Sequence, residues 1–86
     1  MKRVVIVEDD VIIQELQKHY VQRIGHEVKA AFTKGSDAIR FFEEGNQADL
    51  ILMDIRLDDN EDGIDSITAI QEIFPVPVVY ITANTE

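Results

Sequence analysis

The chain has 86 residues, of which 45% are hydrophobic and 29% charged, a composition typical of one small globular domain rather than a disordered segment. It contains no cysteine, which excludes disulfides and thiolate metal sites, and no apolar run near the roughly 18 residues of a membrane span. A net charge of −9 opposes direct binding to nucleic acid or to an anionic membrane; "MKRVVIVEDD" is no signal peptide, so the expected location is the cytoplasm.

The first elements are a buried strand and an amphipathic helix. The β-branched run "RVVIV" (3–7) indicates a strand covered on both faces. A helix should follow it, with Asp9 or Asp10 as the N-cap and Gly25 at its end. Its apolar face is expected to consist of Ile13, Leu16, Tyr20 and Ile24.

The rest of the chain repeats this alternation. The more polar "HEVKAAF" (26–32) predicts a strand at a sheet edge, and "SDAIRFFEEG" (36–45) predicts a short helix. "DLILM" (49–53) and "VPVVYIT" (76–82) are apolar strand patterns on either side of a helix at 63–74. The apolar face of that helix is expected to consist of Ile64, Ile67, Ile70 and Phe74.

Strands that alternate with helices over short connections predict an α/β fold. Such a fold has a parallel sheet, right-handed crossovers and helices on both faces. The carboxyl ends of parallel strands open on one edge, where ligands bind. The pattern therefore predicts that the side chains following each strand will meet there.

Polar side chains stand at three of these strand ends. Glu8 and Asp9 follow the first strand, Asp54 ends the third, and Thr82 ends the fourth. Carboxylates gathered at one edge repel each other unless a cation lies among them. A hard, oxygen-seeking ion such as Mg²⁺ suits this set of ligands. A single acid at a strand end is more often a helix cap, and we expect that role for Asp10.

Four motifs in this order resemble one family. "VVIVEDD", "LILMDIRL", "DGID" and "PVPVVYITA" are similar to the receiver domain of two-component response regulators. The resemblance implies a flavodoxin-like, doubly wound parallel sheet, here of about four strands in the order 2-1-3-4 with three helices. Residues 1–86 would form one receiver domain that lacks its final helix–strand–helix portion.

The resemblance also implies roles for individual residues. Asp54 would be the phosphoacceptor, and Thr82 the switch hydroxyl. Glu8 and Asp9 would hold Mg²⁺ (or Mn²⁺), together with Asp54 and the backbone carbonyl of Arg56. The domain would accept a phosphoryl group from a histidine kinase or a phosphotransfer protein, and would be a signalling switch rather than an enzyme acting on an outside substrate.

Three departures from the family pattern bear on this function. Asp58 stands where receivers usually carry proline, and the segment before "DG" is one residue longer than usual. The family's phosphoryl-contacting lysine on a fifth strand has no counterpart. We therefore expect impaired phosphorylation. The alternative is a structural or assembly fragment of a receiver without signalling activity.

Two other interpretations of the acids are weaker. "DDNEDG" from Asp58 matches the start of a calcium loop, but the twelfth position, which needs a glutamate, is Ala69. A haloacid-dehalogenase-type phosphatase would carry a second aspartate two residues after Asp54, where Arg56 stands. Neither interpretation fits the whole pattern.

The strand at 76–82 raises the question of assembly. In the order 2-1-3-4 it lies at a sheet edge, and it has none of the charges that usually protect such an edge. Two such edges can pair about a two-fold axis. We expect a homodimer or a higher oligomer whose contact includes Val78, Val79, Tyr80 and Ile81.

Overall fold

A computed structural model describes residues 1–55 and 63–81 of the chain. The elements in chain order are β1 (Arg3–Val7), α1 (Val11–Arg23), β2 (Glu27–Phe32), α2 (Gly35–Glu43), β3 (Leu50–Asp54), α3 (Gly63–Ile73) and β4 (Val78–Ile81). This succession confirms the predicted alternation of strands and helices. Within the described ranges, no helix is both long and apolar enough to cross a membrane.

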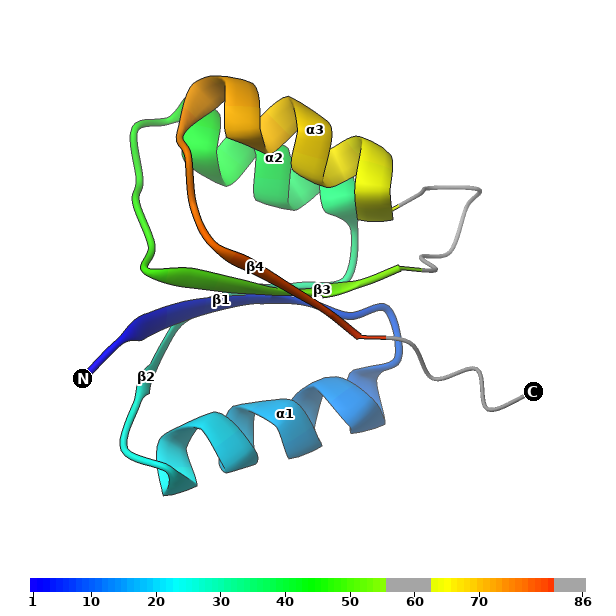
Figure 1. The fold of residues 1–86 in the computed structure, drawn as a ribbon. Coiled ribbons are helices and arrows are strands. Elements are labelled where there is room, and N and C mark those ends of the chain that lie inside the picture. Colours follow the sequence, from blue (N-terminus) through cyan, green and yellow to red (C-terminus); the bar gives the residue numbers. More distant parts are fainter. Residues whose placement is uncertain (56–62, 82–86) are drawn as a thin grey trace.

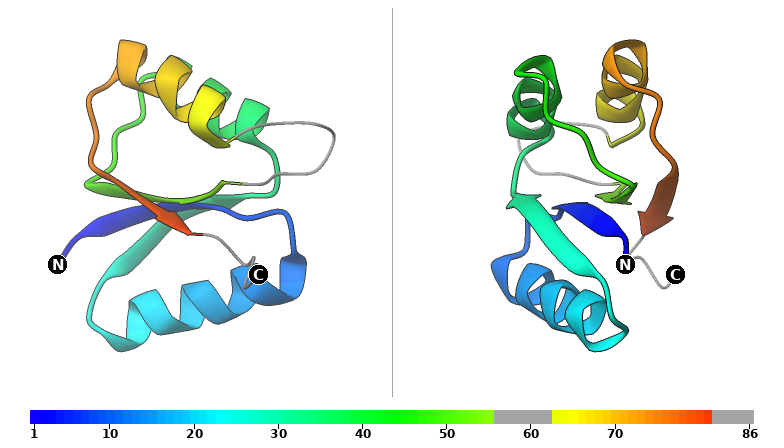
Figure 2. Two further views of the ribbon diagram at one scale, coloured as in Figure 1. Left: turned by 45° about the vertical axis from the view of Figure 1, so that its right-hand side comes forward. Right: turned by 90° about the vertical axis from the view of Figure 1, so that its left-hand side faces the viewer.

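The four strands of the described residues are parallel and form one sheet in the order β2-β1-β3-β4, as predicted. Helix α1 covers one face of the sheet, and α2 and α3 lie side by side on the other (Figure 1). The end-on view shows the sheet between these two helical layers (Figure 2, right). The central pair is β1 and β3, whose registered partners include Val5 with Ile51 and Val7 with Met53.

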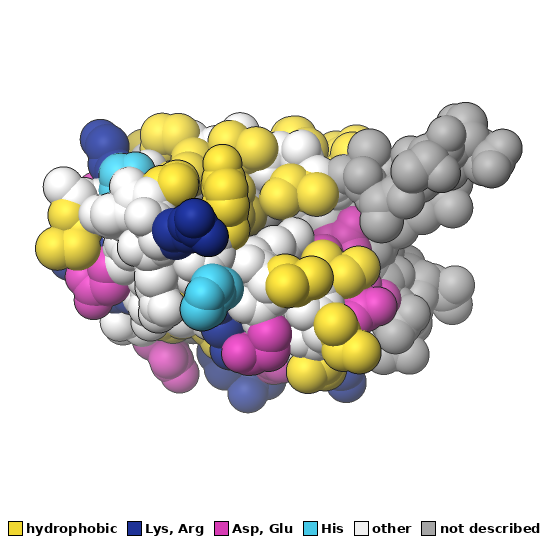
Figure 3. Space-filling view, turned by 90° about the horizontal axis from the view of Figure 1, so that it is seen from below, with side chains coloured by type: hydrophobic (Ala, Val, Ile, Leu, Met, Phe, Trp, Pro, Cys, Tyr) yellow, Lys and Arg dark blue, Asp and Glu magenta, His cyan; other side chains and the backbone are white. Residues whose placement is uncertain are grey.

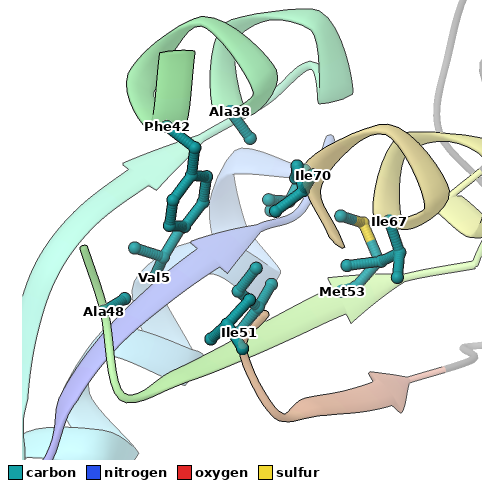
Figure 4. Packing of buried hydrophobic residues seen from close by; sticks show 10 residues of the cluster. Val5, Ala38, Phe42, Ala48, Ile51, Met53, Ile67 and Ile70 are labelled. Carbon is teal, nitrogen blue, oxygen red and sulfur yellow. The ribbon is translucent and has the colours of Figure 1, made fainter. Parts of the chain in front are cut away.

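The larger core lies between the sheet and the pair α2 and α3 (Figure 4). Its fully buried side chains include Val5, Phe42, Ile51, Met53 and Ile70. The predicted face of α3 is right for Ile67 and Ile70 and wrong for Ile64, which is 51% exposed. The face that α3 turns inward instead includes two small residues, Gly63 and Ser66, so the helix lies close to the sheet.

The smaller core lies under α1 and contains Val4, Ile6 and Val21. Here the predicted apolar face is wrong: Leu16, Tyr20 and Ile24 are 65%, 64% and 52% exposed. The two buried residues of α1 are Gln14 and Val21. The helix is rotated so that this row faces the sheet, because the glutamine finds hydrogen-bond acceptors there, as described below.

The displaced apolar row borders an open groove beside α1. The groove has a volume of about 370 Å³ and is lined by Ile13, Leu16, Gln17, Tyr20, Leu52, Val79 and Ile81. In the view onto α1, hydrophobic side chains lie over this face, separated by single charged and histidine side chains (Figure 3). Edge strand β4 therefore adjoins an apolar surface that no other described element covers.

The start of α1 is fixed by Asp10, which confirms its predicted role as a helix cap. Its Oδ1 accepts hydrogen bonds from the backbone N–H groups of Ile12, at 2.9 Å, and Ile13, at 3.1 Å. These bonds satisfy donors that a helix N-terminus otherwise leaves unpaired. The cap begins α1 directly after the two acids that follow β1, and so limits how far those acids can move.

Candidate functional site

Three carboxylates meet at the carboxyl edge of the sheet. Glu8 and Asp9 directly follow β1, and Asp54 is the last residue of β3. The two strands are neighbours whose last registered pair is Val7 with Met53, so Glu8 and Asp54 come next at the same edge. One carboxylate oxygen from each of the three acids lies within 4.8 Å of the others. The strand ends thus converge as expected from the parallel sheet.

Burial and mutual repulsion make this site electrostatically unfavourable by itself. Glu8 is 4% exposed and Asp54 is 8% exposed. Burial, together with the neighbouring Asp54 carboxyl, raises the pKa of Glu8 to about 7. The backbone N–H of Asp10 donates to Glu8 Oε2 at 3.2 Å and partly opposes this rise. A divalent cation bound among the three carboxylates would offset their mutual repulsion.

The donor set fits a hard divalent cation. All three side chains offer carboxylate oxygens as ligand atoms. Mg²⁺ and Mn²⁺ accept such oxygen donors and keep water on their remaining positions. Asp9 is only half-buried, which leaves one side of the cluster open to solvent or to a ligand.

Two glutamines of α1 hold Glu8, and neither is among the site residues predicted from the sequence. Gln14 Nε2 donates to the backbone carbonyls of Glu8, at 3.2 Å, and Phe32, at 2.9 Å. Gln17 Nε2 donates to Glu8 Oε1 at 3.3 Å. The available signal was the spacing of two glutamines three residues apart on a helix that directly follows the acidic pair. One residue fixes the backbone of Glu8 and the other its carboxylate.

The first residue of α3 packs directly against the backbone of Asp54. A Cβ atom on Gly63 would overlap the carbonyl oxygen of Asp54. The Gly63 N–H donates to the Ile55 carbonyl at 3.0 Å, and the Ile55 N–H donates to the Ile81 carbonyl at 3.1 Å. The backbone that carries the Asp54 side chain is therefore held between α3 and the end of β4.

Several predicted residues lie outside the described residues. These are Arg56, Thr82 and the acids of the calcium-like motif from Asp58 to Asp62. The last described residue of β4 is Ile81, which pairs with Asp54 across the sheet.

The comparisons with known proteins agree with this architecture. The family pattern described as "Response regulator receiver domain" matches residues 4–86. The phyllosphere-induced regulator PhyR of Methylorubrum extorquens is 32% identical over 83 residues, which are 96% of this chain and 31% of that protein. The chemotaxis protein CheY of Thermotoga maritima is 34% identical over 74 residues, which are 86% of this chain and 60% of CheY.

A solved structure of the response regulator MaeR bound to beryllium trifluoride superposes with a TM-score of 0.82 at 33% identity. The likeness covers 100% of this chain and 70% of the MaeR chain. The chain spans about a third of the length of the first curated relatives that it matches. On the matched family pattern and the shared fold, the chain belongs to the response regulator receiver domain family.

Proposed function

We propose that Asp54 accepts a phosphoryl group from the phosphohistidine of a histidine kinase or phosphotransfer protein. The chain would then act as a switch in a phosphorelay and would turn over no outside substrate. The observation that carries this proposal is the convergence of Glu8, Asp9 and Asp54 at the sheet edge. The family to which the chain belongs consists of signalling modules, which supports the same function.

In the proposed transfer, an Asp54 carboxylate oxygen attacks phosphorus in line with the histidine nitrogen. The oxygen–phosphorus bond forms while the phosphorus–nitrogen bond breaks, and the imidazole nitrogen keeps the electron pair and is protonated. Glu8, Asp9, Asp54 and the Arg56 carbonyl would hold Mg²⁺ or Mn²⁺, which when bound neutralises charge on the phosphoryl oxygens. The packing of Gly63 keeps the Asp54 backbone in place during the attack.

Thr82 is proposed as the hydroxyl that responds to the new phosphoryl group. It follows Ile81 in the sequence, and Ile81 is the registered partner of Asp54. A phosphoryl group adds negative charge and strong hydrogen-bond acceptors, which a nearby hydroxyl can meet by donating a hydrogen bond. Such a response would convert phosphorylation into a local change at the end of β4.

The first prediction tests Asp54 directly. Acetyl phosphate with Mg²⁺ should add one phosphoryl group to only part of the chain and slowly, in keeping with the impaired phosphorylation expected from the sequence. Asp54→Asn should abolish the added mass in intact-protein mass spectrometry. Asp37→Asn, at an exposed position of α2, should label like the unchanged chain. Beryllium trifluoride with Mg²⁺ should also shift amide NMR signals at the ends of β1 and β3, but not in Asp54→Asn. Absence of both responses from the unchanged chain would favour the structural or assembly alternative.

We also propose that a second copy of the chain covers the edge of β4. This strand ends the sheet order, carries no charged side chain, and exposes 45% of Val79 and 42% of Tyr80. The adjoining groove is lined without a charged residue, so two copies can meet there without bringing carboxylates together despite the net charge of −9. The two β4 strands would pair antiparallel about a two-fold axis.

This assembly gives the second prediction. Sedimentation velocity at micromolar concentrations should show a dimer for the unchanged chain and a monomer for Val79→Lys, since a lysine would introduce a charge at the buried edge. Ile64→Lys is the matched control. Ile64 is 51% exposed and belongs to α3, which lies on the face of the sheet opposite to α1 and the apolar groove. A monomeric unchanged chain, or equal dimerisation of Val79→Lys, would contradict the proposed contact.

A further inference from the structure

Gln17 lies between the acidic site and the apolar groove. Its Nε2 donates to Glu8 Oε1 at 3.3 Å, while the same side chain forms part of the groove lining beside Leu16 and Val79. Glutamine is unusual in such a lining, because its amide must leave water. An apolar side chain at this position would not have this cost, so the presence of a glutamine needs a physical explanation.

The Oε1 atom of Gln17 adds to this cost. The Oε1 atom is buried and has no hydrogen-bond partner among the described residues. A buried amide oxygen without a partner destabilises a fold, whereas an apolar side chain of the same shape would avoid that cost. The amide orientation that points Nε2 at Glu8 therefore benefits the carboxylate and leaves its own oxygen unsatisfied.

Gln14, three residues earlier on α1, makes different hydrogen bonds. Gln14 donates to two backbone carbonyls, those of Glu8 and Phe32, and so ties α1 to β1 and β2. It does not contact the Glu8 carboxylate in these bonds. Among the described residues, Gln17 is thus the α1 side chain that donates a hydrogen bond to the Glu8 carboxylate.

We infer that Gln17 is a positioning residue that holds the Glu8 carboxylate in its cation-binding orientation. The inference rests on the proposed function, in which Glu8 is a ligand of a divalent cation. A ligand carboxylate that is already oriented loses less freedom on binding, and partners in this outer position typically change metal affinity by roughly 10–100-fold. Since the Gln17 bond is long, the lower end of that range is expected.

The third prediction follows from a substitution that keeps size and removes the hydrogen bond. Gln17→Met should weaken Mg²⁺ binding about tenfold in isothermal titration calorimetry. The midpoint of urea unfolding without Mg²⁺ should change little, because the loss of the hydrogen bond to Glu8 and the removal of the unsatisfied Oε1 act in opposite directions. Gln22→Met, at an exposed position of the same helix, is the matched control and should bind Mg²⁺ like the unchanged chain.

The outcomes separate this inference from the proposed function. If the unchanged chain binds no Mg²⁺, the proposed site fails. If the unchanged chain binds and Asp54→Asn binds weakly, but Gln17→Met binds normally, only the role of Gln17 is overturned. A loss of both affinity and stability in Gln17→Met would also overturn it, because that result indicates a general structural role.

A spectroscopic measurement provides an independent readout. In the unchanged chain, the side-chain amide NMR signals of Gln17 should shift during a Mg²⁺ titration, with the same midpoint as the backbone amide of Ile55. The side-chain amide of Gln22 should not shift. A Gln17 signal that stays constant while Ile55 moves would show that the Gln17 contact is not part of the cation site.

Discussion

Gly63→Ala is expected to lower the free energy of unfolding by about 3 kcal/mol, the upper part of the range usual for overpacking. The added Cβ would overlap the Asp54 carbonyl oxygen, and neither backbone can yield without moving β3 or α3. Urea unfolding monitored by circular dichroism measures the effect. This fourth prediction concerns space alone, because Gly63 is not among the glycines with positive φ.

Gly25→Ala is the matched control for this change. Gly25 has φ 93° and nothing within 4 Å of an added Cβ, so alanine there meets backbone strain without a clash. Such strain costs roughly 1–2 kcal/mol. The expected order is therefore a larger loss for Gly63→Ala than for Gly25→Ala, and the reverse order would show that α3 can move away from Asp54 at little cost.

The fifth prediction is a pH dependence of stability that arises from Glu8. Its pKa is about 7 in the folded chain against 4.5 as the ordinary value, so the folded state binds this proton more tightly than the unfolded state does. In the absence of divalent cations, the stability contributed by this group is present below pH 4.5 and is lost as the pH rises to about 7. The loss should amount to roughly 1–3 kcal/mol.

Glu8→Gln tests this dependence because it removes the titrating proton. In EDTA, the variant should be more stable than the unchanged chain at pH 8, and the difference should shrink towards pH 4.5. Glu44→Gln, at an exposed position after α2, should follow the unchanged chain throughout. Added Mg²⁺ at pH 8 should stabilise the unchanged chain and not Glu8→Gln. Parallel pH profiles for the two chains would contradict the assigned role of Glu8.

The convergence of Glu8, Asp9 and Asp54 could be predicted from sequence because it depends only on recognising the buried parallel strands that precede these acids. Buried parallel strands are recognised by continuous apolar runs, and all of them finish at one edge of the sheet. Any acid that follows such a run must therefore lie at that edge. For the same reason, Asp10 could be recognised as a cap, since it stands one residue before the helical pattern.

The rotation of α1 could not be predicted in the same way. Apolar residues at helical spacing indicated a face with Leu16 and Tyr20, yet the sheet receives the neighbouring row with Gln14 and Val21. The acceptors that favour burial of Gln14 are carbonyls at the ends of β1 and β2, which are brought there by the fold. A local hydrophobic pattern contains no information about such distant acceptors.

The close approach of Gly63 to the Asp54 backbone could not be predicted from the sequence either. A glycine at a helix start usually reads as a loop residue or a weak cap, and only the assembled sheet shows that the Asp54 carbonyl occupies the space of its Cβ. Packing of backbone against backbone depends on the distance between two elements, which periodicity does not specify.

The central position of β1 and β3 also determines how long the carboxylate arrangement persists in solution. Both strands have a paired neighbour on each side, whereas β2 and β4 end the order of the described sheet. Edge strands fray in local openings of low free energy, while central strands exchange their amide hydrogens only through large-scale opening. The backbone that carries Glu8 and Asp54 should therefore survive the frequent fluctuations of the edges, and its lifetime should be that of the folded sheet itself.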